Sequence, residues 1–159
     1  MIIRRSIFLL AAGFALTAVA SFGLANAAAP ALQVFSTMAA KAEVQPHAVE
    51  VSAAFTIGPK SSGVDFIKDT VVLRVDKSQF VISPNSFKMT QSGWFKYEGV
   101  INGLDAEIRV VPLGDNRYQM RASLSGKDFK QPGPGPLKVQ VSIGLNSGVA
   151  LAVPREGWL

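Results

Sequence analysis

Apolar and polar residues alternate with a period of two along most of this 159-residue chain. Because successive side chains of an extended strand point to opposite faces, this alternation predicts strands with one buried face. Glycine, proline and asparagine residues separate the alternating segments, and no segment after residue 28 keeps a helical period. The predicted apolar faces consist of Val49, Val51, Ala53, Phe55 and Ile57; Val71, Leu73 and Val75; Phe80 and Ile82; Tyr118, Met120, Ala122 and Leu124; Leu137, Val139, Val141 and Ile143; and Val149, Leu151 and Val153.

The dipeptide Asn102-Gly103 predicts a hairpin, since both residues accept the positive φ of a type I′ turn. Folding about this turn pairs Ile101 with Leu104 and Phe95 with Val110, and it directs these side chains into the core. The register is fixed, because a slip of one residue would turn the apolar set toward solvent. The opposite face of the hairpin then carries Trp94, Lys96, Glu98 and Val100 against Asp105, Glu107, Arg109 and Val111.

Seven to nine short strands of this kind predict an all-β fold, in the form of an antiparallel β-sandwich. A partly open β-barrel is the alternative. We expect a single antiparallel β domain over residues 48–159, large enough to bury about two-thirds of its unfolded surface. Residues 28–47 are expected to be a tether or a short helix, the helix falling within residues 31–42.

Residues 1–27 have the layout of a secretory signal peptide, which would form a helix. Arg4 and Arg5 supply the positive start, an apolar run covers residues 7–19, and Ala25 and Ala27 form a small-residue cut site. Cleavage there would leave Ala28 as the first residue. Retention of residues 7–24 as a membrane anchor is the alternative, although this run only reaches the lower length limit for a spanning helix. An exported protein, periplasmic or extracellular, is therefore expected.

Composition argues against several classes of function. The chain contains no cysteine and one histidine, His47, so it has no disulfide and too few good ligands for zinc. The formal net charge is +5, but Arg4 and Arg5 belong to the signal peptide, and the remaining basic residues form no cluster in the sequence. Nucleic-acid binding is therefore not expected. We find no phosphate-binding glycine loop and no nucleophile elbow, and we expect no metal and no cofactor.

Glu98 and Glu107 are the sharpest candidates for catalysis. Residues directly opposite each other on a hairpin have Cβ atoms about 5 Å apart, and retaining glycosidases hold two carboxyl groups at about that separation. Lys96 and Arg109 are diagonal neighbours of the two glutamates, however, and a solvated cluster of alternating charges is the favoured interpretation. A small hydrolase of envelope polysaccharide is the alternative.

Trp94 is the best candidate for a binding residue. An outward tryptophan on a sheet face is what a sugar-stacking or protein-contact platform uses. The favoured alternative is that Trp94 starts its strand at an edge of the sandwich and is covered by a neighbouring loop, because single surface aromatic residues are common. The predicted binding surface comprises Trp94, Lys96, Glu98, Glu107 and Arg109.

The segment from Ser86 to Val153 resembles a β-rich segment that recurs in uncharacterised exported bacterial proteins. The resemblance is carried by Ser86-Phe87-Lys88, residues 95–103, Glu107-Ile108-Arg109, Pro112-Leu113-Gly114 with Tyr118, and Ile143-Gly144 with Ser147-Gly148. These motifs are turns and core positions, so the resemblance implies the fold and export and implies no site residue.

These observations together predict an exported, non-enzymatic module that binds or scaffolds in the cell envelope. Its partner would be an envelope protein or a glycan, contacted through the Trp94 face or an exposed strand edge. Contact with the membrane would be transient, through the signal peptide. A subunit tethered by an uncleaved N-terminal helix is a further alternative.

Overall fold

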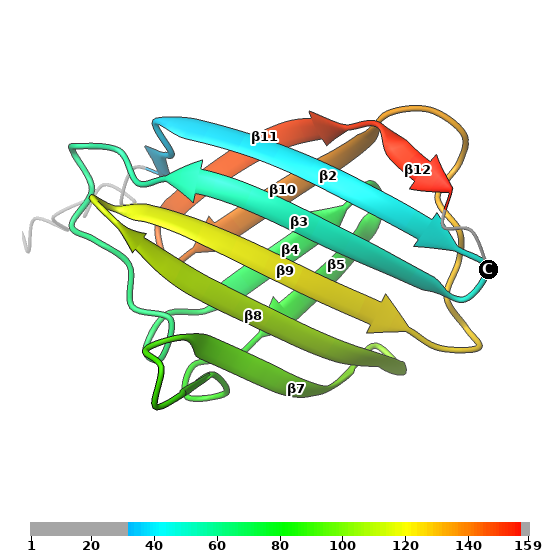
Figure 1. Cartoon of the computed structure of the whole chain (residues 1–159), viewed down its shortest axis with the longest axis horizontal. Helices are drawn as coiled ribbons and strands as arrows, with labels where there is room; N and C mark the ends of the chain where they lie inside the picture. Colours follow the sequence, from blue (N-terminus) through cyan, green and yellow to red (C-terminus); the bar gives the residue numbers. More distant parts are fainter. Residues whose placement is uncertain (1–31, 157–159) are drawn as a thin grey trace, which may run out of the picture.

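The computed structural model describes residues 32–156, which form two mixed β-sheets and no helix (Figure 1). The strands are Gln33–Val34 (β1), Thr37–Gln45 (β2), Ala48–Thr56 (β3), Val71–Val75 (β4), Ser78–Ile82 (β5), Lys88–Met89 (β6), Phe95–Ile101 (β7), Leu104–Gly114 (β8), Arg117–Ser125 (β9), Leu137–Ile143 (β10), Asn146–Ala152 (β11) and Pro154–Glu156 (β12). The five-stranded sheet has the order β1-β11-β10-β4-β5, and the seven-stranded sheet has the order β12-β2-β3-β9-β8-β7-β6. The two sheets do not close into a barrel.

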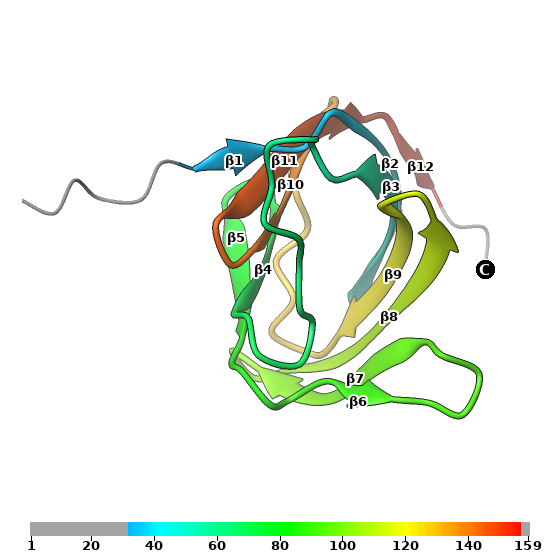
Figure 2. The same ribbon diagram turned by 90° about the vertical axis from the view of Figure 1, so that its left-hand side faces the viewer.

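The hydrophobic core lies between the two sheets, whose arrangement Figure 2 shows in end view. Almost all of the predicted apolar faces point into it, which confirms those assignments. Val71, Leu73, Val139, Val141 and Ile143 line the five-stranded side and are fully buried. Burial of alternate residues on both facing sheets is the main stabilising contribution, at about 25 cal/mol per Å² of apolar surface.

The hairpin of β7 and β8 has the predicted turn and register. Asn102 and Gly103 have φ values of 53° and 80°, and the pairing runs from Ile101 opposite Leu104 to Phe95 opposite Val110. Ile101 and the inward residues of β8 are buried. Phe95 and Tyr97 are half-buried, and the Tyr97 ring lies over Gly99, where a Cβ atom would be 2.6 Å from the Tyr97 hydroxyl oxygen.

The prediction of a wholly antiparallel fold is wrong at two strand pairs. β1 pairs in parallel with β11, and β12 pairs in parallel with β2. Both exceptions have the same cause: at each end the chain passes from one sheet to the other without reversing direction. After β1 the chain enters the seven-stranded sheet as β2, and after β11 it enters that sheet as β12. The two crossings lie at opposite ends of the corner along which β11 runs beside β2 (Figure 2).

The expectation of a tether or short helix is wrong for residues 33–45. These residues form β1 and β2, and all nine residues of β2 pair with β3. The alanines at positions 39, 40 and 42 favour a helix, but pairing with a core strand overrides this weak intrinsic preference. Met38, Ala40, Ala42 and Val44 point inward with the period of a strand.

The predicted inward face of β11 is also wrong. Val149, Leu151 and Val153 are exposed, whereas Asn146, Gly148 and Ala152 are buried. The reason is close packing at the corner: a Cβ atom on Gly148 would collide with the Phe35 ring and would lie 3.0 Å from the Met38 sulfur. Only small side chains fit between β11 and the β1–β2 segment, so the large ones point outward.

One end of the core is covered by residues 57–70, which connect β3 to β4 (Figure 2). Phe66 from this segment is 1% exposed, and its ring centroid lies 5.0 Å from that of Phe95 and 5.4 Å from that of Tyr118. The predicted signal peptide, including Ala25, Ala27 and Ala28, and the alternative anchor lie outside the described residues. Within residues 32–156 there is no helix that could span a membrane.

Candidate functional site

Trp94 lies immediately before β7 and points away from the core, as predicted. It closes a turn in which the Thr90 amide donates to the Trp94 carbonyl oxygen at 2.8 Å and the Trp94 amide donates to Thr90 Oγ1 at 3.1 Å. The residue is 41% exposed. It lines a shallow hollow of about 300 Å³ together with Thr90, Ser92, Phe95, Lys96 and Arg109. We call this the Trp94 hollow.

The four predicted charged residues come together beside this hollow. Lys96 Nζ lies 2.5 Å from Glu98 Oε1 and 3.8 Å from Glu107 Oε1. Arg109 donates from Nε to Glu107 Oε1 at 2.7 Å, and its guanidinium forms an ion pair with the same carboxylate. Lys96 keeps 32% of its side chain exposed and Glu98 keeps 63%. The cluster is thus a solvated network of alternating charges, whose contribution to stability is small.

The ion pairs of this network bear on the protonation of Glu98. Glu98 and Glu107 are direct cross-strand partners, as the sequence predicts. The hydrogen bond from Lys96 holds the pKa of Glu98 below its usual value, with smaller contributions from the charges of Lys96, Arg109 and Lys88. A glycosidase needs one carboxyl group with a raised pKa, so that this group is protonated when it meets the substrate. Glu98 has the opposite shift.

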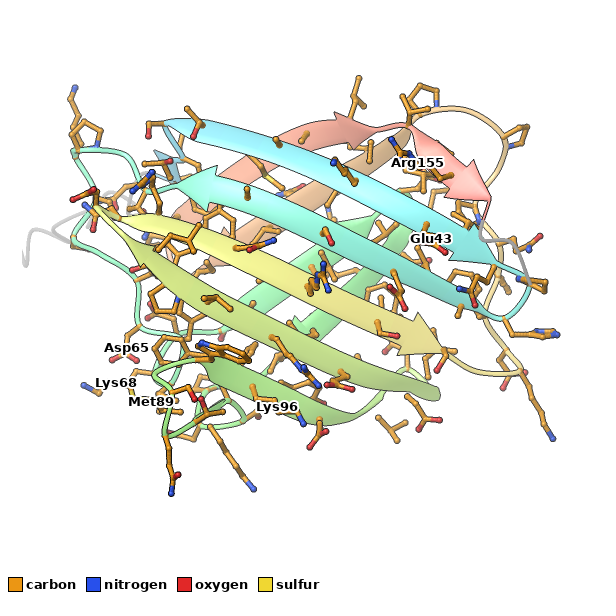
Figure 3. All side chains as sticks on the ribbon, in the orientation of Figure 1. Glu43, Asp65, Lys68, Met89, Lys96 and Arg155 are labelled. Carbon is orange, nitrogen blue, oxygen red and sulfur yellow. The ribbon has the colours of Figure 1, made fainter. Side chains whose placement is uncertain are left out.

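The strand register extends this charge pattern across the sheet. Lys88, Lys96, Arg109, Arg121, Ser52 and Lys41 are successive cross-strand partners from β6 to β2. Five of these six side chains are cationic, and we call the set the basic row. A second row lies two residues away along each strand, on the same face. It consists of the successive cross-strand partners Glu98, Glu107, Ser123, Glu50 and Glu43, and we call it the acidic row. Both rows lie on the outer face of the seven-stranded sheet, the face toward the viewer in Figure 3, where Lys96 and Glu43 are labelled.

A second hollow lies at the far end of the basic row. It has a volume of about 350 Å³, and its lining includes Lys41, Ser52 and Arg121 beside Ala39 and Ala54. The alanines create the depression, because larger side chains at the rim stand above them. We call this the Arg121 hollow. Within residues 32–156, Lys41 and Arg121 form no ion pair, so their charges are available to a ligand.

Sequence reasoning missed Lys41, Ser52 and Arg121 as members of this surface. The alternation of residues 118–124 already placed Arg121 on an outer face. Its neighbours, however, depend on which strands pair and in which register, and residues 37–45 were not recognised as a strand. The signal that could have found them is the identical alternation of Met38, Ala40, Ala42 and Val44.

Two titratable residues outside this surface, His47 and Asp65, make local contacts. His47 is exposed in the turn between β2 and β3, and its carbonyl oxygen accepts a hydrogen bond from Gly126. Asp65 accepts from the amides of Ile67 and Lys68, and these bonds lower its pKa, that from Lys68 most. Within residues 32–156 no group of three or more His, Cys, Asp or Glu residues could hold a metal ion.

A further surface that we did not predict from the sequence is apolar. Leu32, Val34, Leu145, Val149, Leu151 and Val153 are all exposed. Leu32, Val34 and Leu145 also line a depression of about 660 Å³ together with Gly58, Pro59 and Lys60. Exposed apolar side chains grouped in this way are typical of contact surfaces, and the lining of the depression also includes the polar residues Gln33, Lys60 and Ser61.

No family model matches the chain, and neither the curated proteins nor the solved structures contain a match. The resemblance of residues 86–153 to exported bacterial proteins therefore remains an expectation from the sequence.

Proposed function

We propose that the protein is an exported, non-enzymatic binding module of the cell envelope, periplasmic or extracellular, with its ligand on the outer face of the seven-stranded sheet. The two sheets around one core support a β-sandwich scaffold for this surface. The observation that carries the proposal is the Trp94 hollow, where an exposed indole stands beside the cationic side chains of Lys96 and Arg109.

This combination suits a glycan better than it suits hydrolysis. The flat face of an indole stacks on the apolar face of a sugar ring, and the neighbouring charged groups bond to its hydroxyl or carboxylate groups. The position of the hollow supports the same function, because Phe95, Lys96 and Arg109 belong to the paired ladder of β7 and β8 and Trp94 is held by a hydrogen-bonded turn just before it. The lowered pKa of Glu98 favours an ion-paired carboxylate over a proton donor.

The test is the Trp94→Ala variant, with Trp94→Phe as its matched control. The ligand is the polysaccharide fraction of the host envelope, immobilised for interferometry. We expect Trp94→Ala to weaken binding about tenfold, equivalent to about 1.4 kcal/mol, and Trp94→Phe to retain most of it. The melting temperature should stay nearly unchanged, because the Trp94 side chain lies outside the core. Equal binding by the alanine variant and the wild type would refute the proposal.

The proposed export is tested by a separate measurement. The intact mass of the protein from fractionated host cells should correspond to a chain that begins at Ala28, recovered in a soluble fraction. The full-length mass in the membrane pellet would instead favour the tethered subunit.

A further inference from the structure

We infer that the ligand is an acidic linear polysaccharide, which lies across the strands along the basic row from the Trp94 hollow to the Arg121 hollow. This inference rests on the proposed function and names the class of ligand for the same surface. Three observations carry it: the length of the basic row, the position of the acidic row and the availability of charge at the Arg121 hollow.

The two hollows belong to one continuous surface. Lys96 on β7 and Lys41 on β2 are joined by Arg109, Arg121 and Ser52 on the three intervening strands. Neighbouring strands lie about 4.8 Å apart, so the row extends about 19 Å from β7 to β2. A single sugar covers only a fraction of this length. An oligomer of several sugars covers both hollows.

The positive charge that is not ion-paired increases along the basic row from the Trp94 hollow to the Arg121 hollow. Lys96 and Arg109 share their charge with Glu98 and Glu107 at the Trp94 hollow. Arg121 and Lys41 form no ion pair within residues 32–156. A polyanion therefore gains most from the Arg121 hollow, whereas stacking on Trp94 supplies the contact at the other end. Guanidinium groups suit this role, because they bind carboxylates through two parallel hydrogen bonds.

The acidic row restricts the width of the ligand. Glu98, Glu107, Glu50 and Glu43 lie two residues along their strands from the basic row, which corresponds to about 7 Å. A duplex nucleic acid or an anionic membrane would cover both rows and be repelled by the second. A narrow chain avoids the carboxylates or bonds to them through its hydroxyl groups. A single-stranded nucleic acid fits less well, since it favours several aromatic platforms, and within residues 32–156 Trp94 is the only aromatic residue that is exposed.

The experiment uses polygalacturonate oligomers of defined length, with fully methyl-esterified oligomers as the neutral counterpart of the same backbone. Affinity is measured by calorimetry at low and at physiological salt. We expect the acidic oligomers to bind about tenfold or more tightly than the esterified ones, equivalent to one charged contact or more, and to lose affinity as salt rises. Affinity should increase with length until the oligomer covers the row.

Variants locate the contact. Arg121→Gln and Lys41→Gln together should weaken the binding of acidic oligomers about tenfold and should change the binding of esterified oligomers much less. Lys138→Gln, on the exposed outer face of the five-stranded sheet, removes one charge elsewhere and should have no effect. Melting temperatures of the variants exclude unfolding as the cause.

The outcomes separate the two proposals. Equal binding of acidic and esterified oligomers, both lost in Trp94→Ala, would overturn the acidic ligand and leave the binding module intact. No preferential binding of polygalacturonate also overturns the inference, and binding to host envelope polysaccharide then decides the proposed function separately. Tighter binding to single-stranded DNA or to phosphatidylglycerol vesicles that depends on Arg121 would show that the ligand class is wrong.

Discussion

The outer faces of the two sheets differ in character. On the seven-stranded sheet, outward residues form a basic row beside an acidic row, and shallow hollows at both ends interrupt the surface. On the five-stranded sheet, the outward side of β11 presents Val149 and Leu151, which are 48% and 71% exposed. Both faces come from sequences that alternate with a period of two, so alternation alone does not decide which set of side chains is buried.

The difference shows that the space available inside the corner between β11 and the β1–β2 segment decides which side chains of β11 are buried. β3 and β9 face the wide part of the core and bury residues such as Phe55 and Met120. β11 faces the β1–β2 crossing, where Gly148 lies against Phe35 and Met38. An apolar residue that does not fit remains outside, even when solvent is an unfavourable environment for it. The apolar surface of β11 is thus a consequence of packing, whereas packing does not require the charge rows.

A matched pair of leucines gives the largest expected effect. Leu73→Ala removes a fully buried side chain from β4, and it should lower the free energy of unfolding by about 2–5 kcal/mol. Leu151→Ala makes the same chemical change on the exposed side of β11 and should stay within about 0.5 kcal/mol. Urea denaturation measures both. Comparable losses in the two variants would contradict the orientation of β11.

The packing of the corner is tested by glycine substitutions. Gly148→Ala introduces a methyl group against the Phe35 ring and should cost about 1–3 kcal/mol of unfolding free energy. Gly133→Ala is the control, since a Cβ atom there meets no atom within 4 Å. If Gly148→Ala is as stable as Gly133→Ala, small side chains are not needed at this corner, and our explanation of the exposed apolar residues fails.

The smallest effect concerns the charge rows. The pKa of Glu98 is lowered below 4.5 in the folded protein, chiefly by the hydrogen bond from Lys96. Folding therefore favours the ionised carboxylate. The resulting stabilisation is present above pH 4.5 and is lost as the pH falls through the lowered pKa. Carbon-detected NMR titration should find the lowered value in the wild type and a rise toward the usual value in Lys96→Gln. An unchanged Glu98 titration in that variant would show that the pair does not persist in solution.

Much of the fold could be predicted, because the strongest signals are local. The Asn102-Gly103 turn determines its own register, and alternation identified the buried faces of β3, β4, β9 and β10. The errors arose where contacts between residues far apart in the sequence determine the local structure. Alanine-rich β2 is a strand only because β3 pairs with it, and β11 turns its large residues outward because Phe35 occupies the space inside.

The candidate site likewise has one part that local sequence predicts and another part that depends on distant strand pairing. Trp94, Lys96, Glu98, Glu107 and Arg109 could be grouped from one hairpin, since a tight turn places its two strands side by side. Lys41 and Arg121 could not be added, because they join the row through β2, β3 and β9. The order of these strands is not determined by any local motif.

The most direct test of the binding surface is a two-dimensional amide NMR titration of the protein with polygalacturonate oligomers. With oligomers long enough to cover the basic row, we predict shifts around Trp94, Lys96 and Arg109 and also around Arg121 and Lys41. Shifts centred on β10 and β11, or an unchanged spectrum, would contradict the assignment of the seven-stranded sheet as the binding face.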